Sequence, residues 1–299
     1  MKKAGAEVLV ISESELDNQL SLLDLVVFAQ RNYHTLLGGA LLGAVLGLGI
    51  ALLLPSEWEA SALVRVGQSG HTDKTLNSVQ PVLIEPAIQV VDRIKNKSFQ
   101  NLVMKKIGLS QDEDDDKNKL FRLTLKVKLE KSDLISINIR SLSADNAKLH
   151  LSAVINELKS IHTKMLDPTI NRWRQELASI ELEFKGANAD LQRLTKSLDG
   201  RSEALNPSSF AQAALVSNIM IARGEELRAF RDRKLMLEEM LSPERTFVTS
   251  VIGQIEVSNK AVYPKKWSFV LAGLLVGLLL GACMLITNNK VTKNVNKSI

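Results

Sequence analysis

Two long runs of apolar residues dominate the hydropathy pattern, one near each end of the chain. The first, Leu36–Leu54, and the second, Trp267–Ile286, contain no charged side chain. At a helical rise of ~1.5 Å per residue, such runs match the ~30 Å hydrocarbon core of a bilayer. Pro55 ends the first run, and the first run is longer than the apolar core of a signal peptide. The pattern therefore predicts two retained transmembrane helices, with both chain termini on the same side of the membrane.

Glycine recurs at every fourth position in both apolar runs. This spacing puts the glycines on one face of each helix, where a second backbone can approach closely. Glycine is also common in membrane helices in general, so the pattern favours packing between the spans or between subunits without requiring it. The residues concerned are Gly39, Gly43, Gly47, Gly273, Gly277 and Gly281.

The segment between the spans begins and ends with patterns typical of strands. Glu57–Gln68 alternates apolar and polar residues, and Thr246–Val257 is rich in β-branched residues. Both segments adjoin a predicted span, so we expect the two strands to lie beside each other in a membrane-proximal sheet. Gly67–Asn77 is polar and rich in turn residues, whereas Pro86–Ile107 has the periodicity of a helix.

The middle of the chain predicts a hairpin of strands followed by long helices. Phe121–Leu129 and Ile135–Ile139 alternate apolar and polar residues, and the short connection between them predicts an antiparallel hairpin. From about Ala144 to Leu241 the pattern becomes helical, with Pro168 expected to mark a joint or kink.

One apolar seam in this helical region alternates spacings of three and four residues. Such a seam predicts a helix that packs lengthwise against another helix, here the one ending near Leu241 or one from a neighbouring subunit. The predicted fold class is therefore α/β, with two transmembrane helices flanking a membrane-proximal mixed sheet and a long protruding helical hairpin. The seam consists of Ile170, Trp173, Leu177, Ile180, Phe184, Ala187, Leu191, Leu194 and Leu198.

Composition and charge add few candidates for chemistry. The chain of 299 residues has a net charge of +5 but only 4% aromatic residues, and no basic block interleaved with aromatics, so we expect no nucleic-acid partner. Its single cysteine allows no intrachain disulfide, and its four histidines are scattered. No Gly-x-Ser-x-Gly or His-Glu-x-x-His motif occurs, and the acidic run 112–116 lacks the ligand spacing of a calcium loop. We therefore expect no enzymatic activity, no cofactor and no metal site.

The residues that flank the spans resemble motifs of the Wzz-type chain-length determinants, which are polysaccharide co-polymerases of Gram-negative inner membranes. Asp24 stands between two leucines before the first span, and Pro55 and Trp58 begin a Pro-x-x-aromatic-x-Ala-x-Ala pattern after it. Pro264 precedes the glycine-rich second span, where the family has several prolines. The kinase-fused branches of that family carry a phosphate-binding loop, but the segment around Lys74-Thr75 lacks the required glycine, so no kinase is expected.

The resemblance implies an organisation and a function. It implies a cytoplasmic tail (1–35), a first span (36–54), a periplasmic α/β and helical domain (55–266), a second span (267–286) and a cytoplasmic tail (287–299), whereas the Lys and Arg distribution favours this orientation only slightly. It implies a regulator of the chain length of O-antigen or a related surface polysaccharide, and thus of lipopolysaccharide biosynthesis. The implied partners are further copies in a ring-like homo-oligomer, a separate membrane polymerase, lipid-linked polysaccharide and membrane lipid. A capsule or exopolysaccharide export adaptor and a two-span receptor remain as alternatives.

Overall fold

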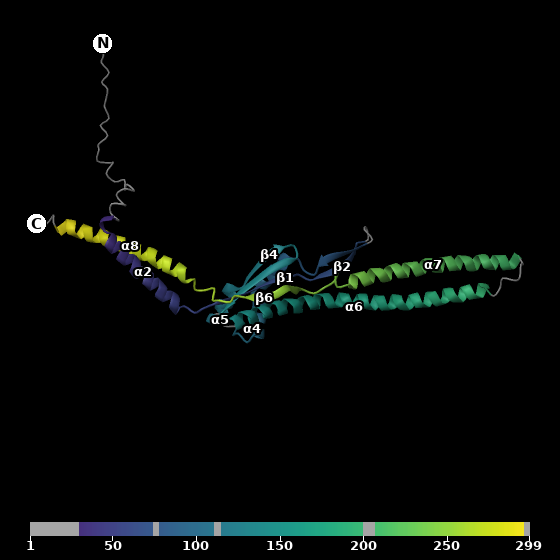
Figure 1. The fold of residues 1–299 in the computed structure, drawn as a ribbon. Coiled ribbons are helices and arrows are strands. Elements are labelled where there is room, and N and C mark those ends of the chain that lie inside the picture. Colours follow the sequence, from purple (N-terminus) through teal and green to yellow (C-terminus); the bar gives the residue numbers. More distant parts are fainter. Residues whose placement is uncertain (1–29, 74–77, 111–114, 200–206, 296–299) are drawn as a thin grey trace, which may run out of the picture. The chain divides into compact units, whose positions relative to one another are not determined.

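The computed structural model describes residues 30–73, 78–110, 115–199 and 207–295. The chain forms two compact units, one made of Met1–Ser56 with Val262–Ile299 and the other of Glu57–Ala261. The first unit contains helices α2 (Tyr33–Leu53) and α8 (Lys266–Val295), which lie against each other (Figure 1). Each is long and apolar enough to cross a membrane by length and composition. The two apolar helices expected from the sequence are therefore confirmed as candidate membrane spans.

The second unit is built on a four-stranded sheet with the strand order β4-β5-β1-β6. The first and last strands pair directly, as expected, with Leu63 opposite Ile252. The sheet was expected to be mixed, but all three of its pairings are antiparallel. The reason is that β4 and β5 form a tight hairpin, and β6 returns from the helical region to run against β1. The strands are β1 (Trp58–Arg65), β4 (Lys126–Lys131), β5 (Leu134–Ser141) and β6 (Ser250–Val257).

The core of this unit lies on one face of the sheet. Ile135, Ile137 and Ile139 of β5 are fully buried, because alternate residues of a strand point to the same face. They form one cluster with apolar residues of four helices, including Leu151 and Leu158. The helices are α3 (Ala87–Lys95), α4 (Lys97–Lys106), α5 (Asp116–Thr124) and α6 (Ala144–Asp199).

The helical character expected for Pro86–Ile107 is confirmed with one interruption, whereas the start expected for the strand at Phe121 was wrong. Pro86–Ile107 forms two helices, because the extended backbone of Asn96 interrupts it and the Asn96 side chain caps α4 by accepting from the N–H of Ser98. Residues 121–124 belong to α5 and not to a strand, because Asp115 caps that helix and Leu123 points into solvent. The expected strand begins only at β4, and its hairpin with β5 is confirmed.

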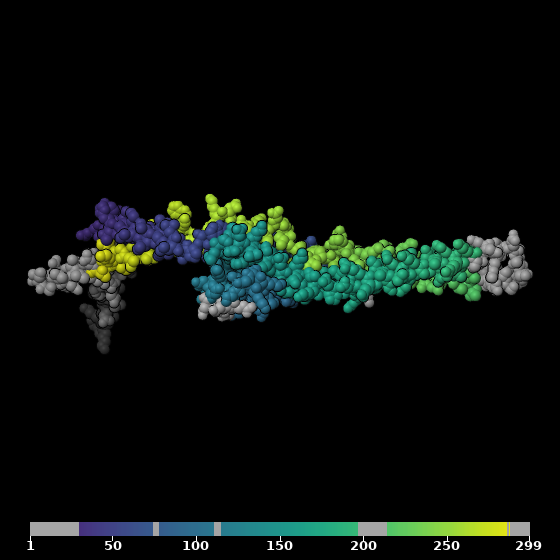
Figure 2. All heavy atoms as spheres, turned by 90° about the horizontal axis from the view of Figure 1, so that it is seen from below, coloured from purple at the N-terminus to yellow at the C-terminus, as the bar shows by residue number. Residues whose placement is uncertain are grey.

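Two long helices project from the sheet. The first is α6, whose 56 residues extend about 84 Å at the standard helical rise. The second is α7 (Pro207–Leu241), which lies alongside α6, and Figure 2 shows the two together as a narrow rod over their described length. The helical hairpin is therefore confirmed. Of the joint or kink expected at Pro168, the joint was wrong, because α6 continues through this exposed position, where water can solvate the carbonyl group that the proline leaves unbonded; a kink there stays a prediction.

A small second sheet lies against the near end of the helix pair. Strand β2 (Gln68–Asp73) lies within Gly67–Asn77, which was expected to be polar and turn-rich, and it pairs antiparallel with β3 (Ser78–Leu83). The expectation failed because burial of β2 depends on partners distant in sequence. The N–H of Gly70 donates to Thr246 Oγ1 at 2.8 Å, and Gln68 exchanges backbone hydrogen bonds with Phe247.

Candidate functional site

The glycines of the two apolar helices face each other. A Cβ atom on Gly39 would meet Gly277 O at 2.7 Å, and one on Gly43 or Gly47 would collide with the backbone of Gly273 or Phe269. Gly281 differs from these positions, because a Cβ there would lie at an ordinary contact distance of 3.5 Å from Thr35 O. Any side chain at these crossing points would force the helix backbones apart, so glycine is required for this close approach. Whether the same face contributes to assembly between subunits stays a prediction.

The residues that flank the spans have different surroundings. Trp58 is half-buried and opens β1, where it pairs with Ser141 of β5. Pro55 is exposed, and Pro264 is half-buried two residues before α8. Asp24 lies outside the described residues. The roles of these residues stay predictions.

The predicted helical seam lies on α6. Ile180 and Ala187 are buried, whereas Trp173, Leu177, Phe184, Leu191 and Leu194 are half-buried, as is Ile170 near the sheet. A pair of helices can cover only a narrow stripe on each member, so partial burial is the expected result within one chain. The side chain of Leu198 lies outside the described residues.

A second apolar cluster joins the seam to the small sheet. Ile180 packs with Leu237 and Met240 of α7 and with Val79 of β3, and Trp173 borders this cluster. The cluster fixes the hairpin β2–β3 to the point where the two long helices leave the main sheet. The spacing of the seam correctly indicated a helix partner, but it contained no signal for the strand that completes the cluster.

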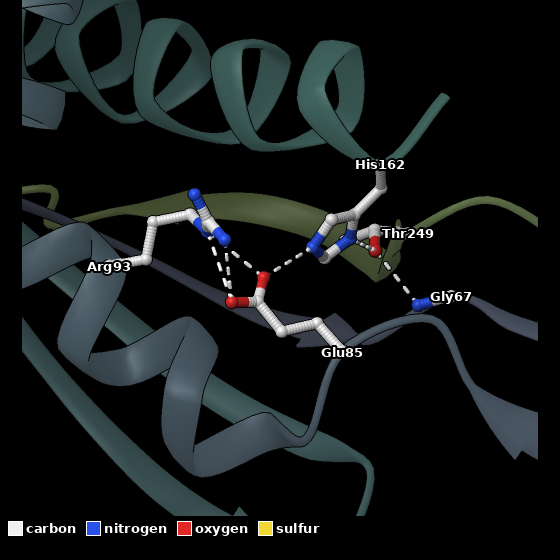
Figure 3. A network of polar contacts seen from close by, with 5 residues as sticks. All are labelled: Gly67, Glu85, Arg93, His162 and Thr249. Atoms are coloured by element: carbon white, nitrogen blue, oxygen red, sulfur yellow. Dashed lines mark hydrogen bonds and ion pairs between the residues drawn. The ribbon is translucent and has the colours of Figure 1, made fainter. Parts of the chain in front are cut away.

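A buried polar network connects four segments of the folded unit through hydrogen bonds and an ion pair (Figure 3). Arg93 of α3 donates to Glu85 from Nε and from Nη2, with Nη2 2.8 Å from Oε1. His162 of α6 places Nε2 3.1 Å from Glu85 Oε2, and its Nδ1 contacts Thr249 Oγ1. The N–H of Gly67 donates to the same Thr249 hydroxyl at 2.8 Å. The network therefore connects the chain after β1, the residue Glu85 before α3 with the last turn of α3, the first half of α6 and the chain before β6.

The bonding pattern assigns the protons. Because the Thr249 hydroxyl accepts from Gly67, its own hydrogen is available to His162 Nδ1, and the imidazole then donates from Nε2 to the Glu85 carboxylate. Burial lowers the pKa of His162 from its ordinary value of 6.5, and attraction to Glu85 offsets only part of this effect. A neutral imidazole in the Nε2–H form satisfies every bond.

Glu85 remains a carboxylate in spite of its burial. Burial alone raises the pKa of this group, but the hydrogen bonds from Arg93 and His162 outweigh that effect and lower the pKa from its ordinary value of 4.5. The side chain of Glu85 is only 6% exposed, so an unpaired charge there would be strongly destabilising. The ion pair with Arg93 is therefore a condition for folding in this region.

A hydroxyl, an imidazole and a carboxylate in series resemble a nucleophile with its base, but this arrangement has no room for a substrate. His162 and Thr249 are fully buried. A Cβ on Gly67 would meet Thr249 N at 2.7 Å and Phe247 O at 2.8 Å, so the backbone is packed directly against the hydroxyl-bearing residue. The chemistry available here is structural. The histidines had been expected to be scattered without partners, and the partners of His162 were missed because they lie 77 and 87 residues away.

No metal-binding cluster occurs within the part of the chain that the structure describes, where no group of three His, Cys, Asp or Glu side chains could hold an ion. The single cysteine, Cys283, is exposed on α8. Basic and acidic side chains of the two long helices form ion pairs with each other, as in Glu176–Arg233 and Glu181–Lys234.

Comparison with known sequences identifies part of the chain. Residues 18–109 match the sequence profile of the Wzz family, described as "Chain length determinant protein". The matched segment covers the first apolar helix and continues through β1, β2, β3, α3 and α4. The resemblance expected from the residues around the first span is therefore confirmed for this segment. No curated relative matches the sequence significantly.

Several solved structures resemble the chain at low sequence identity. A full-length bacterial polysaccharide co-polymerase aligns with 91% of this chain and 99% of its own, at 11% identity and a TM-score of 0.40. A fragment of WzzB, a polysaccharide co-polymerase from Salmonella Typhimurium, aligns with 70% of this chain and 100% of its own, at 9% identity and a TM-score of 0.24. A mutant of the Shigella flexneri lipopolysaccharide O-antigen chain-length regulator WzzBSF aligns with 69% and 99%, at 8% identity and a TM-score of 0.21.

Proposed function

We propose that this protein regulates the chain length of a surface polysaccharide, O-antigen or a related polymer, that a separate membrane polymerase builds. The observation that carries the proposal is the match of residues 18–109 to the chain length determinant family. This segment includes both the first candidate span and the strand that pairs with the last strand of the folded unit. The match therefore includes residues on which the rest of the fold is built.

The architecture supports a mechanical role in preference to a chemical one. The hydroxyl–imidazole–carboxylate series is buried and fully occupied by its own partners. What the chain offers instead is a rigid helix pair, held to a sheet by an apolar cluster and a polar network. Such a structure can influence polymer growth through its dimensions and its contacts with a polymerase.

We infer that the working form is a homo-oligomer. Large apolar side chains stay exposed along the helix pair, among them Leu182 at 71%, Leu215 at 62% and Ile221 at 60%. The sheet also has two edge strands, β4 and β6, which pair on one side only within the described residues. Both features favour lateral contact with further copies, and a ring would let each copy use the same pair of surfaces. Mass measurement of the purified chain in detergent should give a multiple of 33.0 kDa, and a monomer would refute the assembly.

We further propose that the segment from Pro55 to Lys266 is periplasmic and that both tails are cytoplasmic, in the inner membrane. Reporter fusions at Gly70 and at the C-terminus should give signals for opposite compartments. Alkaline phosphatase activity from the C-terminal fusion would contradict this topology.

Deletion of the gene tests the function directly. We expect the bacterium to keep making its surface polysaccharide but to lose the preferred length, so that a gel shows a broad ladder in place of a modal band. The intact gene supplied in trans should restore the band. Complete loss of surface polymer would instead support an export adaptor, and an unchanged ladder would refute length regulation.

A further inference from the structure

A pocket of about 690 Å³ opens where the small sheet meets the two long helices. Its lining includes Trp173 of α6, Arg233 of α7, and His71, Thr72 and Gln80 of the β2–β3 hairpin. It lies within one folded unit, and its volume is in the range of ordinary ligand sites, roughly 300–1,000 Å³.

The lining is held in place by its own contacts. Gly70 packs so closely on α7 that a Cβ there would lie 3.0 Å from Met240 Cα, and Thr72 Oγ1 is 3.1 Å from Met240 Sδ. Arg233 is oriented by Glu176, which accepts from Arg233 Nε at 2.9 Å. Trp173 borders the apolar cluster that contains Ile180. The hairpin wall and the helix wall are therefore fixed relative to each other before any ligand binds.

The lining of the pocket combines an aromatic side chain with several polar and charged side chains. The indole of Trp173 offers a flat apolar face that is half-buried and so keeps an accessible side. His71 and Gln80 are cross-strand partners, so their side chains emerge together on one face of the hairpin. With Arg233, Thr72 and Asp73 they supply planar or hydroxyl groups that donate and accept hydrogen bonds.

A ligand that suits this lining has one apolar face and a rim of hydroxyl groups. Pyranose sugars have this character, because their axial C–H groups form a flat apolar surface and their equatorial hydroxyls point outward. An aromatic ring can contact the apolar face while planar polar side chains bond the hydroxyls. A purely apolar ligand would remove water from Arg233, Gln80 and His71 and offer them no new hydrogen bond, although Arg233 would keep its bond to Glu176 and Gln80 its bond to Ser78.

We propose that this pocket binds a short carbohydrate segment, two or three sugars of the polymer whose length the protein regulates. The inference rests on the proposed function for the identity of the polymer and goes beyond it by assigning a site. Bound sugar would contact both the hairpin and the helix pair, whose relative position is already fixed by their own contacts.

Calorimetric titration of the full-length protein in lipid nanodiscs tests the site. The probe is an oligosaccharide fraction of a few sugars, prepared by hydrolysis of the strain's own surface polysaccharide. Wild type should show saturable binding. Gln80→Ala removes an exposed side chain and Trp173→Leu keeps apolar volume without the aromatic face, so each should weaken binding about fivefold or more. Gln254→Ala, an exposed glutamine on β6, is the matched control and should bind like wild type.

Three outcomes would overturn the site. Wild type with no saturable binding refutes it, and so does binding that Gln80→Ala and Trp173→Leu leave unchanged. A change of oligomer mass in Gln80→Ala, without sugar binding by wild type, would show instead that a neighbouring copy fills the pocket. The proposed function is judged separately by the gene deletion, because loss of length control can occur whether or not this pocket binds sugar.

Discussion

A fully buried histidine needs a partner for each ring nitrogen, and His162 finds both through residues distant in sequence. The sequence shows four histidines, but it does not indicate that Glu85 and Thr249 are the partners of His162. Local spacing carries no information about such pairs, because the contacts form only when α6 packs on the sheet. A search for short sequence motifs cannot find this network, because its residues lie far apart in the sequence.

The protonation state of His162 leads to a pH dependence of folding. Because burial lowers its pKa, the native state binds fewer protons than the unfolded state once the pH falls below the ordinary value of 6.5. Stability should therefore decrease as the pH falls through this range, and Glu85 should add a further loss below its ordinary value of 4.5. The neutral imidazole is the form that the network accepts.

We expect the melting temperature of the full-length protein in detergent to fall between pH 7.5 and pH 5.5. His162→Gln keeps a donor and an acceptor but cannot titrate, so its melting temperature should be lower at pH 7.5 and change less over this range. His71→Gln, which replaces an exposed histidine, serves as the control and should retain the wild-type slope. Equal slopes in wild type and His162→Gln would exclude this histidine as the source.

At the scale of helices and strands, strong periodicity located elements reliably, whereas the polar composition of a segment did not show whether it forms a strand. The hairpin of β4 and β5 and the long helical hairpin were predicted from patterns of two or about 3.6 residues, whereas the apolar helices were predicted from the length and lack of charge of two runs, and the pairing of β1 with β6 from their positions beside those runs. The strand β2 was missed because it contains Gln68, Ser69 and His71, and its burial comes from α7 and the turn after it. The start of β4 was misplaced because alternation over 121–124 also fits one turn of a helix with Phe121 buried and Leu123 exposed.

The helix pair provides a matched test of the seam. Ile180 is 8% exposed in the cluster with Leu237, whereas Leu182, two residues away on the same helix, is 71% exposed. Ile180→Asp would bury an unpaired carboxylate and should destabilise the pair by roughly 3 kcal/mol, seen as about a hundredfold faster amide exchange in α6 and α7. Leu182→Asp should leave exchange nearly unchanged. Similar exchange in both variants would mean that the seam is not packed as described.

At the scale of the whole chain, the polypeptide passes between the two units at two points, after α2 and before α8. The family match includes α2 together with the first part of the folded unit. The open question is whether the apolar helices only anchor the chain or also take part in regulation. The glycine face allows the two possibilities to be separated, because it can be altered without changing the folded unit.

Gly277→Leu adds a side chain at a position where even a Cβ would lie 3.0 Å from Gly43 Cα. The helix backbones must therefore separate, which should destabilise their packing by about 1–3 kcal/mol. Gly49→Leu is the matched control, because nothing lies within 4 Å of a Cβ at that position. If the close pairing of α2 and α8 contributes to regulation, Gly277→Leu should broaden the polysaccharide length distribution at normal protein level in the membrane, and Gly49→Leu should preserve the modal band. Immunoblotting of membranes and gel separation of the polysaccharide measure the two quantities in the same cells. A modal band preserved in both variants would limit the helices to anchoring, because the backbone clash at Gly277 would then have no consequence for polymer length.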